Sequence, residues 1–311
     1  MREPSAQLHQ IAATYSIAAM DMNSGEMGGA VQSHFFSVGP AVLWAEAGAG
    51  VVITQSVVNR QYGPEGLSLL KSGRNADAVL KELVGSDSGK AYRQAAILDC
   101  LGNTAAHTGS SCIREAGHAN GLYYSVQANM MLNDTVWSAM ESAFLHAQGT
   151  LGERMTAALC AAEQEGGDIR GRQSAALKVV KTEASGDVSS DVVLDLRVED
   201  NPEPLEELSR LLSLSKGYQM LELGDEAMEQ GNADNAARYY QQANELLGEN
   251  PEALYWHGIA LLNAGNTSEG MDILRPLFSS SPNWVELTLR LPESGLASFN
   301  AAVLDELRNR R

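Results

Sequence analysis

The first two thirds of the chain alternate short strand-like runs with helical runs. Residues 14–20 (TYSIAAM) form an apolar run, residues 21–25 (DMNSG) have turn composition, and residues 26–33 (EMGGAVQS) form a second run. This order predicts a β-hairpin. The further predicted strands are residues 50–56, 93–99, 104–108, 122–127, 173–181 and 191–198.

Helix start signals occur between the strand-rich blocks. Each predicted helix follows a residue whose side chain accepts hydrogen bonds from free N–H groups of the first turn. The predicted helices are residues 76–84 after Asn75, residues 135–147 after Asp134, and residues 151–165 with Thr150 and Glu153 as a capping box. Paired helices between strand-rich blocks predict layered α+β structure with largely antiparallel strands.

Beyond about residue 204 the strand pattern stops and a 34-residue period begins. The paired positions are Gly224 and Gly258, Gly231 and Gly265, Ala236 and Gly270, Tyr240 and Leu274, and Ala243 and Leu277. Small residues at this period resemble the tetratricopeptide repeat, in which paired helices approach closely. The resemblance implies a surface that docks a peptide or protein partner. A helical cap or a dimer contact is the alternative interpretation.

Composition narrows the function classes. Among 311 residues, 44% are hydrophobic and 20% are charged, and the net charge is −17, which argues against nucleic-acid binding and against docking on an anionic membrane. Three cysteines without a CxxC pair predict free thiols and no structural metal. The first 13 residues contain no apolar signal segment, and no cofactor motif is present, so we expect a cytoplasmic protein without a cofactor.

Thr14 heads the first strand and is the candidate nucleophile. When the peptide bond before such a threonine is cut, the free α-amino group serves as general base for the hydroxyl. Here the cut falls after Ala13. The alternative interpretation is that Thr14 is a β-branched residue that starts a strand.

Polar residues at the ends of other predicted strands supply candidate binding groups. The amides of Gln127 and Asn129 are candidates for stabilising an oxyanion, and Arg170 and Arg172 for binding a carboxylate. The remaining candidate substrate-binding residues are Ser33, His34, Gln55 and Asn59. Taken singly, residues of these types more often occupy turns and caps. A second candidate nucleophile is the Cys112 thiol with His118 as its base.

Ordered motifs along residues 14–213 resemble one known family. They are Thr14-Tyr-Ser-Ile, Ser24-Gly-Glu, Tyr62-Gly-Pro-Glu-Gly-Leu, His107-Thr-Gly, Ala116-Gly-His, Tyr124-Ser-Val-Gln-Ala-Asn, Gly166-Gly-Asp-Ile-Arg-Gly-Arg-Gln-Ser-Ala-Ala-Leu and Asp195-Leu-Arg-Val-Glu-Asp. The chain resembles the bacterial domain of unknown function 1028 family, which is grouped with the N-terminal-nucleophile (Ntn) hydrolases. The resemblance implies a four-layer αββα sandwich, followed by the tetratricopeptide-like helical region that some members carry.

These observations predict three segments and two competing functions. The segments are a leader or propeptide at residues 1–13, an Ntn-hydrolase-like domain at residues 14–213, and an all-α repeat domain at residues 214–311. In many family members the matching threonine directly follows the initiator methionine, whereas 13 residues precede Thr14 here. The first hypothesis is an amidohydrolase acting on a small amide or peptide-like substrate. The second is a non-enzymatic scaffold that binds a protein partner through the repeats, and a homodimer is expected in either case.

Overall fold

The computed structural model describes residues 11–12, 14–248 and 250–310 of the chain. The chain divides into two compact units, Met1–Leu212 and Ser213–Arg311. Most of the predicted leader, residues 1–10 and 13, lies outside the described residues.

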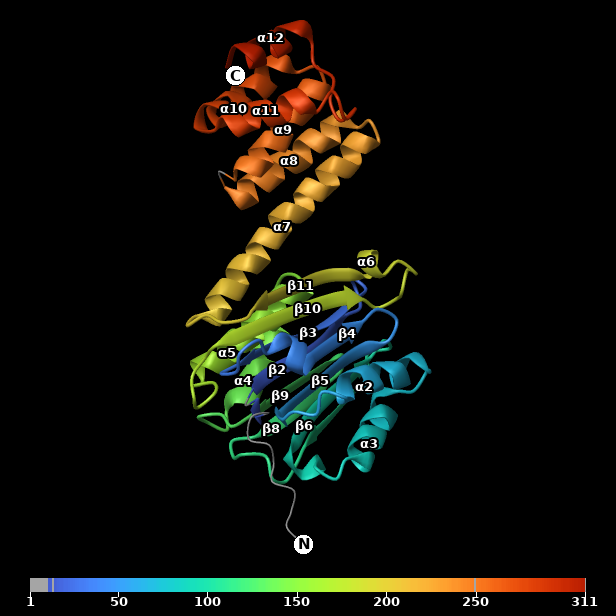
Figure 1. The fold of residues 1–311 in the computed structure, drawn as a ribbon. Coiled ribbons are helices and arrows are strands. Elements are labelled where there is room, and N and C mark those ends of the chain that lie inside the picture. The colour runs from blue at the N-terminus through green and yellow to red at the C-terminus, as the bar shows by residue number, and fades with distance from the viewer. Residues whose placement is uncertain (1–10, 13, 249, 311) are drawn as a thin grey trace. The chain divides into compact units, whose positions relative to one another are not determined.

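A six-stranded antiparallel sheet forms one half of the first unit (Figure 1). Its strand order is β11-β10-β3-β2-β9-β8, which places β2 in the interior of the sheet. The bounds are β2 (Thr14–Asp21), β3 (Glu26–Ser33), β8 (Gly117–Gly121), β9 (Tyr124–Asn129), β10 (Ser174–Lys181) and β11 (Val192–Val198).

A five-stranded antiparallel sheet forms the other half, in the order β1-β5-β6-β7, with β4 also paired to β5. The bounds are β1 (Ile11–Ala12), β4 (Leu43–Glu46), β5 (Gly50–Val57), β6 (Arg93–Asp99) and β7 (Thr104–Thr108). Residue pairing between β5 and β6 runs from Gly50↔Asp99 to Ser56↔Arg93. One edge of β5 is therefore taken by β6, and β4 and β1 share the other.

Two helix pairs cover the outer faces of the sheets. Figure 1 shows α2 (Tyr62–Lys71) and α3 (Ala76–Ser86) against the five-stranded sheet. The second pair is α4 (Val136–His146) and α5 (Leu151–Gln164), which packs on the six-stranded sheet. The shorter helices are α1 (Gly39–Val42), α6 (Val188–Asp191) and the 3₁₀ turn Lys90–Tyr92, and α7 (Pro204–Glu229) leads into the second unit.

Within the described residues of the first unit, three buried clusters follow from the alternation of side chains along the strands. On β2, Tyr15 and Ile17 belong to the cluster shared with α4 and α5, whereas Ala18 and Met20 belong to the cluster between the sheets. A third cluster joins α2 and α3 to β5 and β6. Thr14 and Ser16 continue the alternation of Ala18 and Met20, so their side chains face the space between the sheets.

The predicted α+β class, with two antiparallel sheets and a C-terminal helical region, is confirmed. The Asn75 cap and the Thr150–Glu153 capping box are also confirmed. The predicted Asp134 cap is wrong, because α4 begins at Val136 and Thr135 precedes it without a side-chain capping bond. The strand predicted at residues 122–127 is Tyr124–Asn129, since Tyr123 has a positive φ of 68° and belongs to the turn.

The second unit consists of helices in an antiparallel repeat. After α7 come α8 (Ala233–Leu247), α9 (Pro251–Asn263), α10 (Thr267–Ser280), α11 (Pro282–Arg290) and α12 (Ala301–Arg310). A Cβ atom added at Gly224 would lie 2.6 Å from the Tyr240 ring, and one added at Gly258 would lie 2.5 Å from Leu274 Cγ. Residues 34 positions apart thus make equivalent helix contacts, as the period predicts.

Replacing Gly258 with alanine is expected to lower the free energy of unfolding of the second unit by about 1–3 kcal/mol, because the new methyl group overpacks the seam against Leu274. Thermal and urea unfolding would measure it. The control is Gly85→Ala, at an exposed helical site in the first unit with no atom within 4 Å of the added Cβ. This control should be neutral or slightly stabilising, and an equally neutral Gly258→Ala would contradict the close contact.

A candidate active site around Thr14

Thr14 is the first residue of β2 and is fully buried. In the antiparallel register it lies opposite Ser33 of β3 on one side and Asn129 of β9 on the other. Three of the polar residues predicted to act together are therefore adjacent in one sheet. β2 is an interior strand, so the backbone on both sides of Thr14 is fixed by ladder pairing.

Hydrogen bonds hold both the side-chain hydroxyl and the backbone carbonyl oxygen of Thr14. Its Oγ1 donates to the Ala12 carbonyl oxygen at 2.8 Å and lies 3.3 Å from Ser33 Oγ. The Thr14 carbonyl oxygen accepts from Gln55 Nε2 at 3.1 Å and from Asn129 Nδ2 at 3.3 Å. Since Gln55 comes from β5 and Asn129 from β9, one amide from each sheet fixes the backbone of the candidate nucleophile.

The sequence did not indicate Gln94, which links these amides. Its Oε1 accepts from Gln55 Nε2 at 2.7 Å and from Asn129 Nδ2 at 3.0 Å. Its Nε2 lies 2.9 Å from Thr108 Oγ1 and 2.9 Å from the Ala128 carbonyl oxygen. Gln94 is fully buried on β6, and its side chain hydrogen-bonds to β9, so it links the five-stranded sheet to the six-stranded sheet next to Thr14.

Gln127 lies opposite Ser16, two residues along β2 from Thr14, and its side chain does not bond to Thr14. Its Nε2 donates to Ser16 Oγ at 2.6 Å, and Ser16 Oγ donates to Gln55 Oε1 at 2.6 Å. Ser125 Oγ donates to Gln127 Oε1 at 3.0 Å. Gln55 Nε2 donates to the Thr14 carbonyl oxygen, which can only accept, and the directions of the bonds from Ser16 and Gln127 follow from this. Gln127 therefore orients the Gln55 amide through Ser16.

One buried acceptor in this network has no hydrogen-bond partner within the described part of the chain. It is Asn129 Oδ1, on a residue that is 1% exposed. A buried carbonyl oxygen without a donor costs free energy. Asn129 sits directly across the ladder from Thr14 and its Nδ2 donates to the Thr14 carbonyl oxygen, so this oxygen belongs to a side chain that already holds Thr14.

His34 and Arg170 gather around the buried carboxylate of Asp168. The His34 backbone N–H donates to Asp168 Oδ2 at 3.0 Å, and Arg170 Nη2 donates to the same oxygen at 2.9 Å. The Asp168 side chain is fully buried and that of Arg170 is 31% exposed. Arg170 thus holds a carboxylate of its own chain and fixes the loop after β3.

Arg172 also has carboxylate partners in the same unit. Its Nε lies 3.2 Å from Glu163 Oε1, and its Nη1 bonds to Glu203. The three residues help to line a hollow of about 310 Å³. Tyr15 donates to Glu163, and burial, followed by this carboxylate, raises the Tyr15 pKa well above its ordinary value. Arg172 therefore lies near solvent on the helix-covered side of the six-stranded sheet.

Asn59 belongs to a separate polar cluster beyond the end of β5. Its Nδ2 donates to Asp87 Oδ2 at 3.2 Å, and the same oxygen accepts from Arg93 Nε at 2.8 Å and Tyr62 Oη at 3.0 Å. Burial alone would raise the Asp87 pKa, but hydrogen bonds from Arg93, the Gly89 N–H and Asn59 outweigh it and lower the pKa to about 2. Asn59 thus stabilises a loop rather than contacting Thr14.

Ionised Asp87 is expected to stabilise the fold above about pH 4 by about 2 kcal/mol, because its folded-state pKa lies below the ordinary 3.8. This contribution disappears as the pH falls through about 2. Asp87→Asn should therefore be less stable than wild type at pH 7, and the difference should shrink in acid. Urea unfolding from pH 7 to pH 2 measures it, with the exposed Asp134→Asn as control. A difference that does not change with pH would contradict the assignment.

The alternative pair of Cys112 and His118 is divided between two networks. Cys112 Sγ donates to the Arg93 carbonyl oxygen at 3.4 Å, and burial raises the pKa of the thiol. His118 Nδ1 lies 2.8 Å from Thr108 Oγ1, and burial lowers the pKa of its imidazole. A thiol held in its protonated form is a weak nucleophile.

The described end of the leader lies on the five-stranded sheet. Ile11 pairs with Val57 and Ala12 pairs with Ser56, both in antiparallel register. Ala12 is fully buried in the cluster between the sheets. Ala13, on the N-terminal side of the predicted cleavage point, lies outside the described residues.

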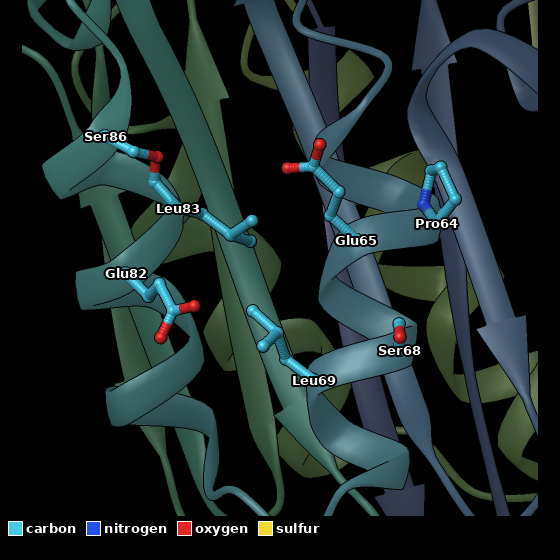
Figure 2. A pocket seen from close by; sticks show the side chains of 7 residues that line it. All are labelled: Pro64, Glu65, Ser68, Leu69, Glu82, Leu83 and Ser86. Carbon is cyan, nitrogen blue, oxygen red and sulfur yellow. The ribbon is translucent and has the colours of Figure 1, made fainter.

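A separate groove of about 470 Å³ lies between α2 and α3 (Figure 2). Leu69 and Leu83 point toward each other across it, and Glu65 and Glu82 lie along its sides. The five-stranded sheet lies between this helix pair and the space that Thr14 faces. Across the described ranges, no group of three or more His, Cys, Asp or Glu side chains is placed to hold a metal ion.

Comparisons with known proteins agree with this architecture. A tetratricopeptide repeat model matches residues 227–287. The crystal structure of protein SPO2555 from Silicibacter pomeroyi, assigned to the DUF1028 family, is 32% identical with a TM-score of 0.58, and the match covers 64% of this chain and 87% of that one. A search of curated proteins gave no match.

None of the helices in the described part of the chain is long and apolar enough to cross a membrane. The model of the "Family of unknown function (DUF1028)" matches residues 14–208, most of the first unit. The resemblance predicted from the motifs is thereby confirmed, and the chain belongs to the DUF1028 family and carries a C-terminal tetratricopeptide repeat.

Proposed function

We propose that the first unit is an Ntn-type amidohydrolase whose nucleophile is Thr14 after removal of residues 1–13. On this proposal, residues 14–213 form the catalytic domain, an αββα sandwich of the Ntn-hydrolase type, and residues 214–311 form the repeat domain. The observation that carries the proposal is the position of Thr14. It heads an interior strand of the six-stranded sheet, its side chain faces the space between the sheets, and amide side chains from both sheets hold its carbonyl oxygen.

The chemistry follows from a freed Thr14 amine. The hydroxyl oxygen forms a bond to the substrate carbonyl carbon while its proton passes to the α-amino group. Collapse of the tetrahedral intermediate breaks the C–N bond, and the ammonium returns the proton to the leaving nitrogen. Water then hydrolyses the Thr14 ester and restores the hydroxyl. Cofactors take no part in these steps.

The surrounding residues have distinct roles in this proposal. Asn129 Oδ1 accepts a hydrogen bond from the freed amine, which supplies the donor that this buried oxygen lacks within the described residues. Gln55 and Asn129 position Thr14 through its carbonyl oxygen. Of the four predicted amides these two reach Thr14, whereas Gln127 acts through Ser16 and Asn59 bonds to Asp87.

Ser33 Oγ lies 3.3 Å from the attacking oxygen and is proposed to hydrogen-bond to it. For Arg170 and Arg172, anchoring an anionic substrate requires that the substrate compete with Asp168, Glu163 and Glu203. We therefore place the substrate's anionic group, if it has one, near solvent at Arg172.

The proposal predicts that hydrolysis requires a free amine on Thr14. A chain in which Thr14 directly follows the initiator methionine, which the cell removes, should cleave at least one member of a panel of chromogenic amides. The same chain with one extra glycine left before Thr14 should be inactive, because the amine is then part of a peptide bond. Equal activity in both chains would exclude the amine as base.

The competing proposal is a non-enzymatic scaffold, and two observations favour it. The leader is paired with β5 next to a fully buried Thr14, and a tetratricopeptide repeat follows. This repeat suggests a protein partner. The scaffold proposal predicts an unprocessed chain without amidase activity, and loss of a co-purifying partner when residues 214–311 are deleted. A cytoplasmic location and a homodimer remain part of both proposals, to be tested by fractionation and by light scattering.

A further inference from the structure

The edge of β5 beside Thr14 is already occupied by an extended peptide, the chain's own leader. Ile11 and Ala12 pair with Val57 and Ser56 in antiparallel register. β4 covers the same edge further along, at Gly50–Ile53. Ser56 and Val57 are therefore the part of this edge that the leader closes. Removal of the leader would leave their backbone groups open, as at any sheet edge.

Two features mark this stretch of β5 as a built site. Ser56 has a φ of 69°, in the left-handed region that residues other than glycine rarely adopt, and such strain is retained mainly where function requires it. The neighbouring residue on the same strand, Gln55, sends its amide to the Thr14 carbonyl oxygen. The same strand thus supplies both a pairing edge for an extended chain and a bond to the candidate nucleophile.

The space beside this edge fits a small side chain. Ala12 is fully buried and belongs to the cluster between the sheets. Its carbonyl oxygen accepts the bond from Thr14 Oγ1 at 2.8 Å, so the leader backbone passes within reach of the attacking oxygen. A larger side chain at this position would overpack the cluster.

We propose that the processed protein binds an extended peptide, or a peptide-like acyl chain, as an added strand on β5 at Ser56 and Val57, with a small apolar side chain where Ala12 now lies. This proposal rests on the proposed function, because it assumes that the leader leaves. Backbone pairing provides the affinity and the buried alanine position provides the selectivity. The leader then acts as the first occupant of the substrate's acyl subsite.

The probe is a fluorescein-labelled peptide with the sequence of residues 7–13, QLHQIAA. Its binding is measured by fluorescence anisotropy to three forms of the chain, each checked by intact mass. They are the unprocessed full chain, the unprocessed full chain with Ala12→Asp, and the chain beginning at Thr14. Because burying an unpaired carboxylate at the position of Ala12 is costly, Ala12→Asp should release the leader from β5. A second peptide carries phenylalanine in place of Ala12.

The alanine peptide should bind the chain beginning at Thr14, and Ala12→Asp, at least ten-fold more tightly than the unprocessed wild-type chain. The phenylalanine peptide should bind at least ten-fold more weakly to both open forms. Hydrogen exchange at β5 should increase in Ala12→Asp and be suppressed again by the alanine peptide. Absence of binding to both open forms, or equal binding of the two peptides, would overturn the strand-addition site.

Amide hydrolysis by the chain beginning at Thr14 is measured in parallel and separates the two proposals. If the chain hydrolyses amides but the alanine peptide neither binds to it nor inhibits the hydrolysis, the hydrolase proposal is retained and the peptide site is overturned. Selective binding of the alanine peptide without hydrolysis of any amide would retain the site on β5 and count against the hydrolase.

Discussion

Replacing Thr14 with alanine in the processed chain is expected to lower amide hydrolysis by about 10³-fold or more, because the attacking oxygen is lost. Thr14→Ser keeps a hydroxyl at the same position, next to Ser33 Oγ, and should retain measurable hydrolysis. Single-turnover and steady-state assays on the chain beginning at residue 14 would compare the three forms.

The matched control for this series is Ser16→Ala, two residues along the same face of β2. Ser16 bonds to Gln55 and Gln127 and is not placed to attack a substrate, so its loss should have a smaller effect on hydrolysis than loss of Thr14. Full activity of Thr14→Ala would exclude Thr14 as nucleophile. Retention of the fold in each variant is checked by circular dichroism.

Replacing Gln94 with leucine is expected to lower the free energy of unfolding of the first unit by about 3 kcal/mol or more. The change removes the acceptor shared by Gln55 Nε2 and Asn129 Nδ2, and the donor to Thr108 Oγ1 and the Ala128 carbonyl oxygen. Each buried polar group left without a partner adds its desolvation cost. Urea unfolding followed by circular dichroism measures the loss.

Gln61→Leu is the control for Gln94→Leu. Gln61 is exposed and precedes α2 without a side-chain capping bond, so its replacement should change the free energy of unfolding by less than about 0.5 kcal/mol. In the processed chain Gln94→Leu should also lower hydrolysis, since Gln55 and Asn129 would no longer be held against Thr14. If Gln94→Leu were as stable as wild type, the amide network would contribute little to the free energy of unfolding.

Local signals in the sequence predicted the elements that depend on local chemistry. The hairpin of β2 and β3 follows from its two runs and the turn between them, and α5 follows from the capping box of Thr150 and Glu153. Three strands were missed, namely β1, which is taken up below, β4 and β8. β4 has four residues, and β8 (GHANG) has the composition of a loop, so each is held in place by pairing with a neighbour that the sequence alone does not reveal.

The candidate site was predicted in part. Thr14, Ser33, Gln55 and Asn129 are brought together because strand ends from both sheets meet there. Gln94 was missed, although one signal was present: it is a glutamine in an otherwise apolar strand, RQAAILD. Its role depends on partners on β5, β7 and β9, far away in the sequence.

The carboxylate partners of Arg172 were not predicted either. Arg172 pairs with Glu203, 31 residues later, and with Glu163 on α5, so no local pattern signals the contacts. The pairing of the leader with β5 was not predicted either, because the leader is polar and two residues of strand carry no periodic signal.

The identity of the first residue in the protein purified from its native cells tests the central claim most directly. Intact mass and N-terminal sequencing should show a chain that begins at Thr14 with a free α-amino group. A native protein that retains residues 1–13, with β1 still protected from hydrogen exchange on β5, would contradict the hydrolase and leave the scaffold as the function.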